Sequence, residues 1–267
     1  MAVSLTQAPT GYILWEGPSP IDGCPIVAIA TMNSSNTKTG NMVQTWILRQ
    51  DLHPVEAVKT GEDESICGGC PHRGNRINGK GRTCYVNVGQ GPRAVWAAYT
   101  AGKYPRIDQS AVPTLGQGRA VRLGAYGDPA MVPVGIWRSL ISLSKGHTGY
   151  THQWNTPIGQ NLKDICMASV DTESQAMQAR DNGWRTFRVR TSIGSVLSKE
   201  VVCPASEEGG HKTTCENCLL CRGADPRRPN MVQGIVIVDH GPLSVQAINR
   251  RTEALAAARA RKAAQSV

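Results

Sequence analysis

The sequence predicts an α/β fold, specifically a TIM-like barrel that is irregular or incomplete and carries cysteine-rich metal-binding loop insertions. Short apolar runs recur along the 267 residues, and several are followed by a glycine-rich or polar loop and then by a helix pattern. The runs number roughly eight, and eight strands with helices in about 250 residues is the arrangement of a closed α/β barrel. An open parallel sheet is the alternative, because a strand count made from sequence is readily wrong by one or two.

Each predicted strand is a mainly apolar run bounded by polar or glycine-rich residues, which is typical of strands buried in a sheet. The predicted strands are residues 26–30, 45–49, 85–88, 121–126, 165–170, 184–190, 201–203 and 235–239. Helices are expected over residues 93–102, 132–143 and 172–181, each after a turn that contains Gly, Pro or Asp.

The clearest unit begins with the strand at 165–170. Asp171 or Thr172 can cap the N-terminus of the helix that follows. The pair Asn182-Gly183 can end that helix, because Asn and Gly readily adopt the left-handed backbone conformation found at helix C-termini. The chain then returns as the strand at 184–190. A strand, a helix and a strand of this length predict a parallel crossover.

The chain carries a formal net charge of +9. A surplus of this size favours a polyanionic partner, since each Lys or Arg that meets a phosphate releases condensed counterions. Nucleic acid is therefore the expected partner, although a solvated basic surface explains the charge equally well. We expect one domain over residues 1–248 and a basic, Ala-rich helix or tail over residues 249–267.

No apolar run approaches the length that spans a membrane, and the first residues lack a basic stretch followed by a hydrophobic one. We therefore expect a soluble, cytoplasmic protein without a membrane partner. In a reducing compartment, closely spaced cysteines indicate metal binding rather than disulfides. The sequence leaves the oligomeric state open.

The strongest motif is a group of four cysteines in the loop at 203–223. Cys203 precedes Pro204, and Cys215, Cys218 and Cys221 follow at three-residue spacing. Four thiolates suffice for a closed tetrahedral zinc site, and the compact spacing also resembles the cluster-binding run of bacterial-type ferredoxins. Zn²⁺ and a [4Fe-4S] cluster are both chemically sensible, and His211 is a possible substitute ligand.

A second group of cysteines lies in the loop at 66–84, where Cys67, Cys70 and Cys84 supply three thiolates. His72 is a plausible fourth ligand, and Cys24 before Pro25 is another. A zinc knuckle is the simpler interpretation, while three thiolates alone could hold a cluster with one open iron. The ninth cysteine, Cys166, sits inside a predicted strand and is expected in the core.

Three aspartates lie at the carboxyl ends of predicted strands, namely Asp128, Asp171 and Asp239. Working residues of barrels and open α/β sheets cluster at the carboxyl ends of strands, where a carboxylate can act as nucleophile or general base. A helix cap explains Asp171 equally well, and a turn explains Asp128.

The segment 149–154 is a candidate for binding a base. Tyr150 and Trp154 could stack on its ring, and His152 and Gln153 could read its edge. The alternative is a strand with Trp154 in the core. Arginines near the predicted strands could meet phosphates, and these are Arg122, Arg138, Arg188 and Arg190.

Several phrases of the sequence resemble a group of small bacteriophage proteins. They are ICGGCPHR at 66–73, TCYVNVGQGP at 83–92, RLGAYGDP at 122–129, VCPAS at 202–206 and TCENCLLCRG at 214–223. A cysteine-bearing barrel with acidic strand ends is similar in outline to the phage DNA-guanine transglycosylases, relatives of the tRNA-guanine transglycosylases.

This resemblance implies exchange of guanine for a 7-deazaguanine base in DNA, in the cytoplasm of a host cell. It implies an aspartate that attacks C1′ of the nucleotide, a second acidic group for the proton, and a structural zinc. It also implies DNA rather than RNA and a small purine-like base as substrates. Neither catalytic aspartate is matched by motif, so Asp128, Asp171 and Asp239 are candidates by position alone.

The chain also departs from that pattern. The tRNA enzymes carry C-x-C-x-x-C with a distant histidine, whereas this chain has C-x2-C-x2-C with Cys203 upstream and an additional group at 66–84. A radical-SAM-like iron–sulfur enzyme is the main rival, although the usual C-x3-C-x2-C loop is absent. The third hypothesis is a non-catalytic, zinc-stapled nucleic-acid-binding protein.

Overall fold

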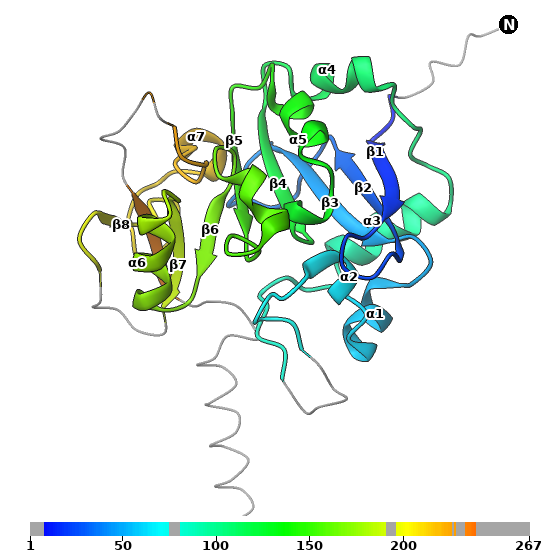
Figure 1. Ribbon diagram of the computed structural model, residues 1–267. Helices are drawn as coiled ribbons and strands as arrows, with labels where there is room; N and C mark the ends of the chain where they lie inside the picture. The colour runs from blue at the N-terminus through cyan, green and yellow to red at the C-terminus, as the bar shows by residue number, and fades with distance from the viewer. Residues whose placement is uncertain (1–7, 75–80, 191–195, 226, 228–232, 239–267) are drawn as a thin grey trace, which may run out of the picture.

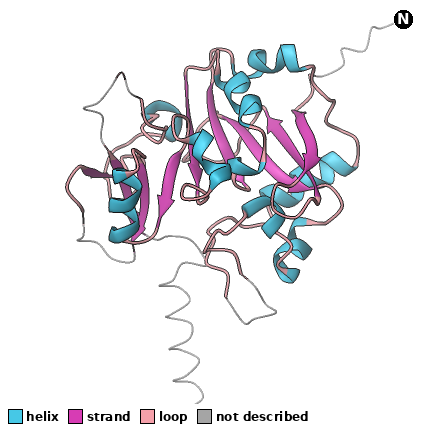
Figure 2. Ribbon diagram, in the orientation of Figure 1, coloured by secondary structure: helices cyan, strands magenta, loops and turns pink. Residues whose placement is uncertain are grey.

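The computed structural model describes residues 8–74, 81–190, 196–225, 227 and 233–238. Nine strands form one sheet in the order β1-β2-β3-β4-β5-β6-β7-β9-β8, and several helices lie in front of it in the view of Figures 1 and 2. The α/β class is confirmed. Within the described residues, β1 and β8 lie at the two edges of an open sheet, which is the alternative to the barrel.

The sheet starts with three antiparallel strands, β1 (Gly11–Pro18), β2 (Pro25–Thr31) and β3 (Val43–Arg49). This start explains why the predicted barrel does not close. A closed barrel needs its first and last parallel strands to pair. Here β3, the first parallel strand, has one edge bonded to β4 and the other already occupied by β2.

The strands from β3 to the far edge are all parallel. They are β4 (Ala120–Tyr126), β5 (Gly146–Thr151), β6 (Met167–Val170), β7 (Thr186–Arg190), β8 (Glu200–Val202) and β9 (Gly234–Val238). The predicted crossover is confirmed, because β6 and β7 pair in parallel and α6 (Glu173–Asp181) connects them. Thr172 caps α6 by accepting the N–H of Gln175 at 3.1 Å.

The remaining helices are short. They are α1 (Pro54–Thr60), α2 (Glu64–Cys67), α3 (Gly91–Thr100), α4 (Val112–Gly116), α5 (Val134–Ile141) and α7 (Cys215–Cys218), with 3₁₀ turns η1 (Gln109–Ala111), η2 (Pro129–Met131) and η3 (Pro157–Leu162). The predicted strand at 85–88 is wrong, since these residues form a loop. The Arg82 guanidinium donates to the carbonyls of Cys84 and Val86, which therefore need no neighbouring strand.

The parallel sheet buries side chains on both faces. On one face, Leu123 and Val170 belong to the main core together with Trp137 and Leu140 of α5. A second, smaller core includes Ile237 of β9. Its other fully or largely buried members are Met167, Cys203, Cys221 and Ile235. The loop that carries the 203–223 cysteines therefore packs on the sheet as part of the protein interior.

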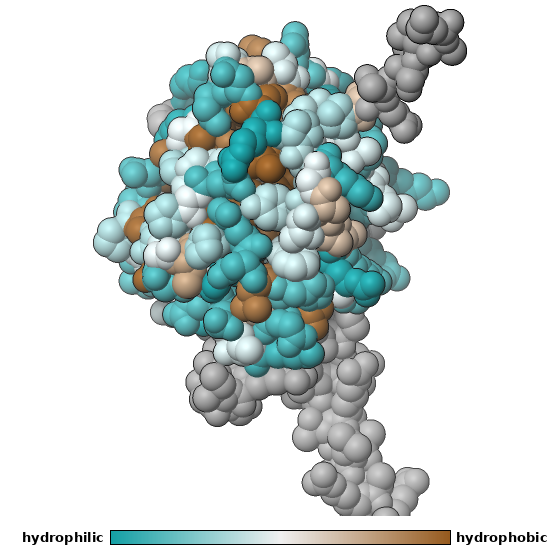
Figure 3. Space-filling view, turned by 90° about the vertical axis from the view of Figure 1, so that its right-hand side faces the viewer, coloured by the Kyte–Doolittle hydropathy of each residue, from teal (hydrophilic) through white to brown (hydrophobic). Residues whose placement is uncertain are grey.

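The face of the molecule shown in Figure 3 is mainly hydrophilic, with apolar residues scattered between polar ones. Among the described helices, none is both long enough and apolar enough to cross a membrane. The predicted basic tail at 249–267 and Asp239 lie outside the described residues.

Candidate functional site

A cavity of about 240 Å³ lies over one face of the parallel sheet. Alternate side chains of a strand point to the same face, and this face contributes residues from five strands. They are Arg122 of β4, Tyr150 of β5, Ser169 of β6, Phe187 and Val189 of β7, and Ile237 of β9. Both cysteine groups also line this cavity, although more than a hundred residues separate them in the sequence.

The 66–84 loop lies beyond the carboxyl ends of β4 and β5. The Asp128 N–H donates to the Ile66 carbonyl at 2.7 Å, and the Gln153 amide donates to the Cys67 carbonyl at 3.2 Å. Gly68 has φ +56°, and a Cβ on it would lie 2.7 Å from the Gln153 amide carbon. The glycine after Cys67 is therefore required both by the backbone and by close packing.

Residues 219–221 of the 203–223 loop lie along β5, beginning at its amino end. The Gly149 N–H donates to the Cys221 carbonyl at 3.0 Å, and Leu219 lies against Gly146, the first residue of β5. The Cys215 N–H donates to the Lys38 carbonyl at 2.9 Å, which ties α7 to the loop before β3. The two cysteine loops thus cover the cavity from the two ends of β5.

The two Cys-Pro turns have the same local structure. The backbone N–H groups of His72 and Arg73 contact the Cys70 sulfur and those of Ala205 and Ser206 contact the Cys203 sulfur, while Arg73 and Ser206 also donate to the carbonyls of Cys70 and Cys203. In both turns the donors come from the second and third residues after the cysteine. Hydrogen bonds of this kind stabilise the negative charge of a sulfur that binds metal.

The thiols within each group interact electrostatically with one another. Cys67 interacts with Cys70 and Cys84, and Cys221 interacts with Cys203, Cys215 and Cys218. Burial raises the pKa of Cys70 and of Cys221 to about 12. Thiols in this environment stay protonated near neutral pH unless a bound cation stabilises the thiolates.

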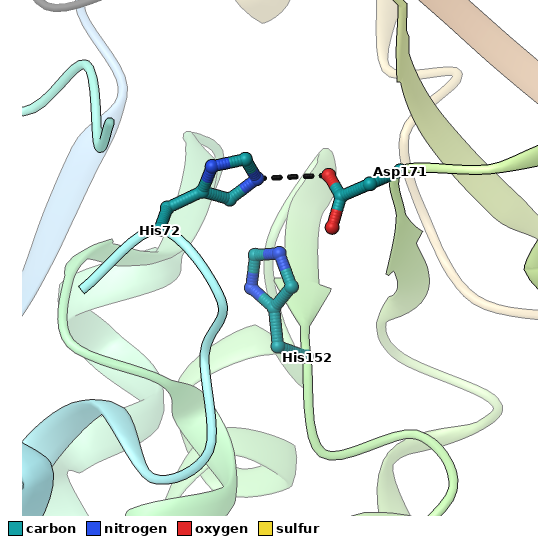
Figure 4. Close-up of side chains that lie close together, drawn as sticks. All are labelled: His72, His152 and Asp171. Atoms are coloured by element: carbon teal, nitrogen blue, oxygen red, sulfur yellow. Dashed lines mark hydrogen bonds and ion pairs between the residues drawn. The ribbon is translucent and has the colours of Figure 1, made fainter. Parts of the chain in front are cut away.

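Three side chains meet at the carboxyl edge of the sheet, beside the first cysteine group. They are His72, His152 directly after β5, and Asp171 directly after β6, and Figure 4 shows all three facing one another. His72 Nε2 lies 2.8 Å from Asp171 Oδ1, and His72 Nδ1 lies 2.8 Å from Thr83 Oγ1. The rings of His72 and His152 meet edge to face, 5.4 Å apart.

The charges of this group are set by burial and by the contacts within it. Burial lowers the pKa of His152 to about 4, so its ring is neutral near pH 7. Burial alone would raise the pKa of Asp171, but the hydrogen bond and the charge of His72 outweigh it and lower that pKa. The group therefore combines a carboxylate with a neutral imidazole at the edge of the cavity.

Asp128 organises the turn between β4 and η2. Its carboxylate accepts the Ala130 N–H at 3.0 Å, the Thr151 hydroxyl at 2.7 Å and the His152 N–H at 2.8 Å. Burial raises its pKa to about 6 despite these three donors. Both oxygens of Asp128 are occupied, and they hold His152 in place at the end of β5.

Arg122 of β4 brings a positive charge to the face of the sheet that lines the cavity. Its Nη2 lies 2.5 Å from the Tyr85 hydroxyl, while its Nε is buried and has no hydrogen-bond partner among the described residues. Among the described ion pairs, none includes Arg122. Tyr150 packs beside it in the cavity wall, with its ring tilted against Phe187 at 4.6 Å.

The other residues predicted for substrate contact have different positions. Trp154 is 5% exposed and belongs to the core, and Gln153 is 3% exposed and bonds to the Cys67 backbone. Arg188 and Arg190 pair with Glu200 and Glu208. These arginines therefore stabilise the fold locally, as does Arg138 through its ion pair with Asp164.

The extra ligands considered for the cysteine groups are also elsewhere. The ring nitrogens of His72 bond to Asp171 and Thr83 rather than facing the thiols. Cys24 lies in a turn and donates its N–H to Asp22, and His211 is exposed; neither is among the residues lining the cavity. Cys166 is fully buried in the core, as expected.

Sequence reasoning missed the Tyr85–Arg122 contact and Phe187 in the cavity wall. Phe187 alternates with buried neighbours along β7, and that period-2 pattern is the signal that could have placed it on the cavity face. In comparisons with protein-family models, curated proteins and solved structures, nothing matches this chain.

Proposed function

We propose that this protein is an iron–sulfur enzyme of the radical-SAM-like type that modifies a nucleotide base, with DNA as the preferred substrate. The observation that carries the proposal is that both cysteine groups line one cavity, together with side chains from five parallel strands. Zinc ions that only stabilise loops do not need to lie beside the same cavity. Two cofactors that act on one substrate must both lie close to it.

The spacing of the sulfurs favours a cluster over a single zinc ion. A tetrahedral zinc with Zn–S bonds of about 2.3 Å holds its sulfurs roughly 3.8 Å apart. All nine cysteines are described, yet no three of their sulfurs lie within 4.8 Å of one another. A [4Fe-4S] cluster places an iron at each of four separate corners and so binds more widely spaced thiolates.

The two groups differ in the number of thiolates they offer. Cys203, Cys215, Cys218 and Cys221 would complete the coordination of one cluster. Cys67, Cys70 and Cys84 would leave one iron open. A cluster with an open iron supplies one-electron chemistry on S-adenosylmethionine.

Arg122 supports an anionic substrate. The Arg122 guanidinium is half-buried and takes part in none of the described ion pairs, whereas the more deeply buried Arg49 and Arg188 each have an acidic partner. The carboxylate or phosphate of a bound molecule would supply the missing charge for Arg122. The aromatic wall of Tyr150 and Phe187 offers a flat surface for a base, and the net charge of +9 suits a nucleic acid.

The test is anaerobic purification followed by measurement of iron, acid-labile sulfide and the visible spectrum. We expect two clusters per chain, one lost in Cys70→Ser and the other lost in Cys218→Ser. Cys24→Ser is the matched control, because Cys24 is a free cysteine away from the cavity. A colourless protein with one or two zinc ions and no iron refutes the proposal.

Base exchange in DNA is the second candidate, and the position of Asp171 is the observation that favours it. Asp171 lies at the carboxyl end of β6 beside the cavity, and its Oδ2 accepts no hydrogen bond from the described residues. Asp128 suits a nucleophile less well, because both of its oxygens are engaged. On this hypothesis Asp171→Asn abolishes incorporation of labelled guanine into DNA, while iron removal has no effect.

A further inference from the structure

The cluster of His72, His152 and Asp171 is separate from the cysteine groups in its chemistry. It offers two imidazole nitrogens and one carboxylate oxygen, and these three ligand atoms all lie within 4.8 Å of one another. Among the described residues, this is the one set of three or more His, Cys, Asp or Glu side chains with that spacing. The three residues come from three different segments, so the fold itself brings them together (Figure 4).

His152 gives an independent sign that this cluster binds a ligand. Its Nε2 is buried and has no hydrogen-bond partner among the described residues. In Figure 4 the far side of the His152 ring points to the space between His72 and Asp171. A buried polar atom without a partner is destabilising by roughly 1–3 kcal/mol, so a retained one calls for an explanation.

The surrounding contacts hold the three side chains in a fixed arrangement. Thr83 Oγ1 bonds to His72 Nδ1 at 2.8 Å, which directs Nε2 at Asp171. Metal-binding histidines typically have their second ring nitrogen bonded in this way. The backbone N–H of His152 donates to Asp128, and the backbone N–H of Asp171 donates to Gln175 Oε1 at 2.9 Å, so the backbone of both residues is also held.

We propose that His72 Nε2, His152 Nε2 and a carboxylate oxygen of Asp171 bind one divalent transition-metal ion of the zinc, iron(II) or manganese class. Imidazole and carboxylate ligands suit these ions. Three protein ligands leave at least one coordination position open, which is the arrangement of catalytic rather than structural sites. His72 and His152 line the cavity, so a molecule bound in the cavity can reach the ion. The site is independent of whether the cysteines bind clusters or zinc.

The test is titration of the metal-stripped full chain with Co²⁺. Cobalt on cysteines gives intense thiolate-to-metal charge-transfer absorption, whereas cobalt on nitrogen and oxygen gives only weak ligand-field bands. The two kinds of site are therefore read separately in one experiment. We expect one Co²⁺ without thiolate absorption, with affinity at least ~10-fold weaker in Asp171→Asn and in His152→Ala.

Asp171→Asn can keep the hydrogen bond to His72 and should fold even if His152→Ala does not. His53→Ala is the matched control, since His53 caps α1 away from the cavity. The inference is overturned if Asp171→Asn binds this Co²⁺ as tightly as the unmodified protein. It is also overturned if Asp171→Asn instead removes the thiolate absorption, because these residues would then belong to a cysteine site.

Discussion

Replacement of Glu200 by Gln tests how the second cysteine group is held in place. The Glu200 side chain on β8 is 0% exposed and accepts hydrogen bonds from Arg188 Nη2 at 2.7 Å, Arg180 Nη2 at 3.0 Å and the Leu197 N–H at 2.9 Å. Removing one partner of a buried ion pair destabilises a protein by roughly 3–5 kcal/mol, because the remaining charge is left buried. Here two guanidinium groups, 3% and 14% exposed, lose their anion.

We therefore expect Glu200→Gln to lower the free energy of unfolding by about 3 kcal/mol or more in urea denaturation at pH 7. Metal affinity at the 203–223 loop should fall as well, because Cys203 directly follows β8. Glu207→Gln is the control, since Glu207 is exposed. A Glu200→Gln protein within ~0.5 kcal/mol of the parent would refute the reasoning.

The same residue predicts a pH dependence. Burial alone would raise the pKa of Glu200, but the hydrogen bond and charge of Arg188 outweigh it and lower that pKa from the usual 4.5. A carboxylate with a lowered pKa in the folded state stabilises the protein fully above its unfolded pKa, and this contribution is lost as the pH falls through the folded value. The parent should therefore lose more stability than Glu200→Gln between about pH 6 and about pH 3. Equal losses in the two proteins would contradict the assignment.

Three further substitutions test the cavity. Arg122→Met should weaken binding of a nucleoside monophosphate roughly 10- to 100-fold in calorimetry, since a charged hydrogen bond contributes about 1.5–3 kcal/mol, while Arg138→Met should have no effect. Gly68→Ala should destabilise the fold by at least ~1–2 kcal/mol because of its φ of +56° and its contact with a side-chain amide, whereas Gly69→Ala, with open space around it, should not. Asp128→Asn should lower the free energy of unfolding by about 1–3 kcal/mol, because an amide nitrogen cannot accept the hydrogen bonds now made to both carboxylate oxygens. Unchanged urea midpoints in the last two variants would show that these contacts do not stabilise the fold.

Most strands and the parallel crossover could be predicted because their signal is local. An apolar run of five or six residues indicates a buried strand wherever it lies, and β2, β3, β4, β6, β7, β8 and β9 all overlap predicted strands. The closure of the sheet could not be predicted in this way. An apolar run does not indicate which strand it will pair with, or whether the pairing will be parallel or antiparallel. The antiparallel pairing of β2 with β3 decides that the sheet stays open.

The cysteine groups could be found from their spacing, but their shared cavity could not, because it depends on how two distant loops cover β5. His72 shows a second limit of sequence reasoning. Its place two residues after Cys70 predicts a ligand for the same metal as the cysteines. In the folded turn, the backbone N–H of His72 contacts the Cys70 sulfur, and that of Arg73 donates to the Cys70 carbonyl at 3.3 Å. The His72 side chain is thereby directed to Asp171, on the other side of the turn.

The positions of the two loops relative to β5 lead to one more step in the proposed function. The group with three thiolates lies at the carboxyl edge of the sheet, beside His152 and Asp171, which is where α/β proteins place their reacting groups. Of the group with four thiolates, the α7 part lies at the amino end of β5, where Leu219 packs against Gly146, while Cys203 directly follows β8. A closed cluster has no position for substrate and is limited to electron transfer, whereas an open one can bind a reactant. Chemistry is therefore expected at the Cys67 end of the cavity. Loss of the cluster at Cys218 should then slow the reduction of S-adenosylmethionine but leave its binding intact. Loss of the cluster at Cys70 should abolish both the binding and the reduction of S-adenosylmethionine.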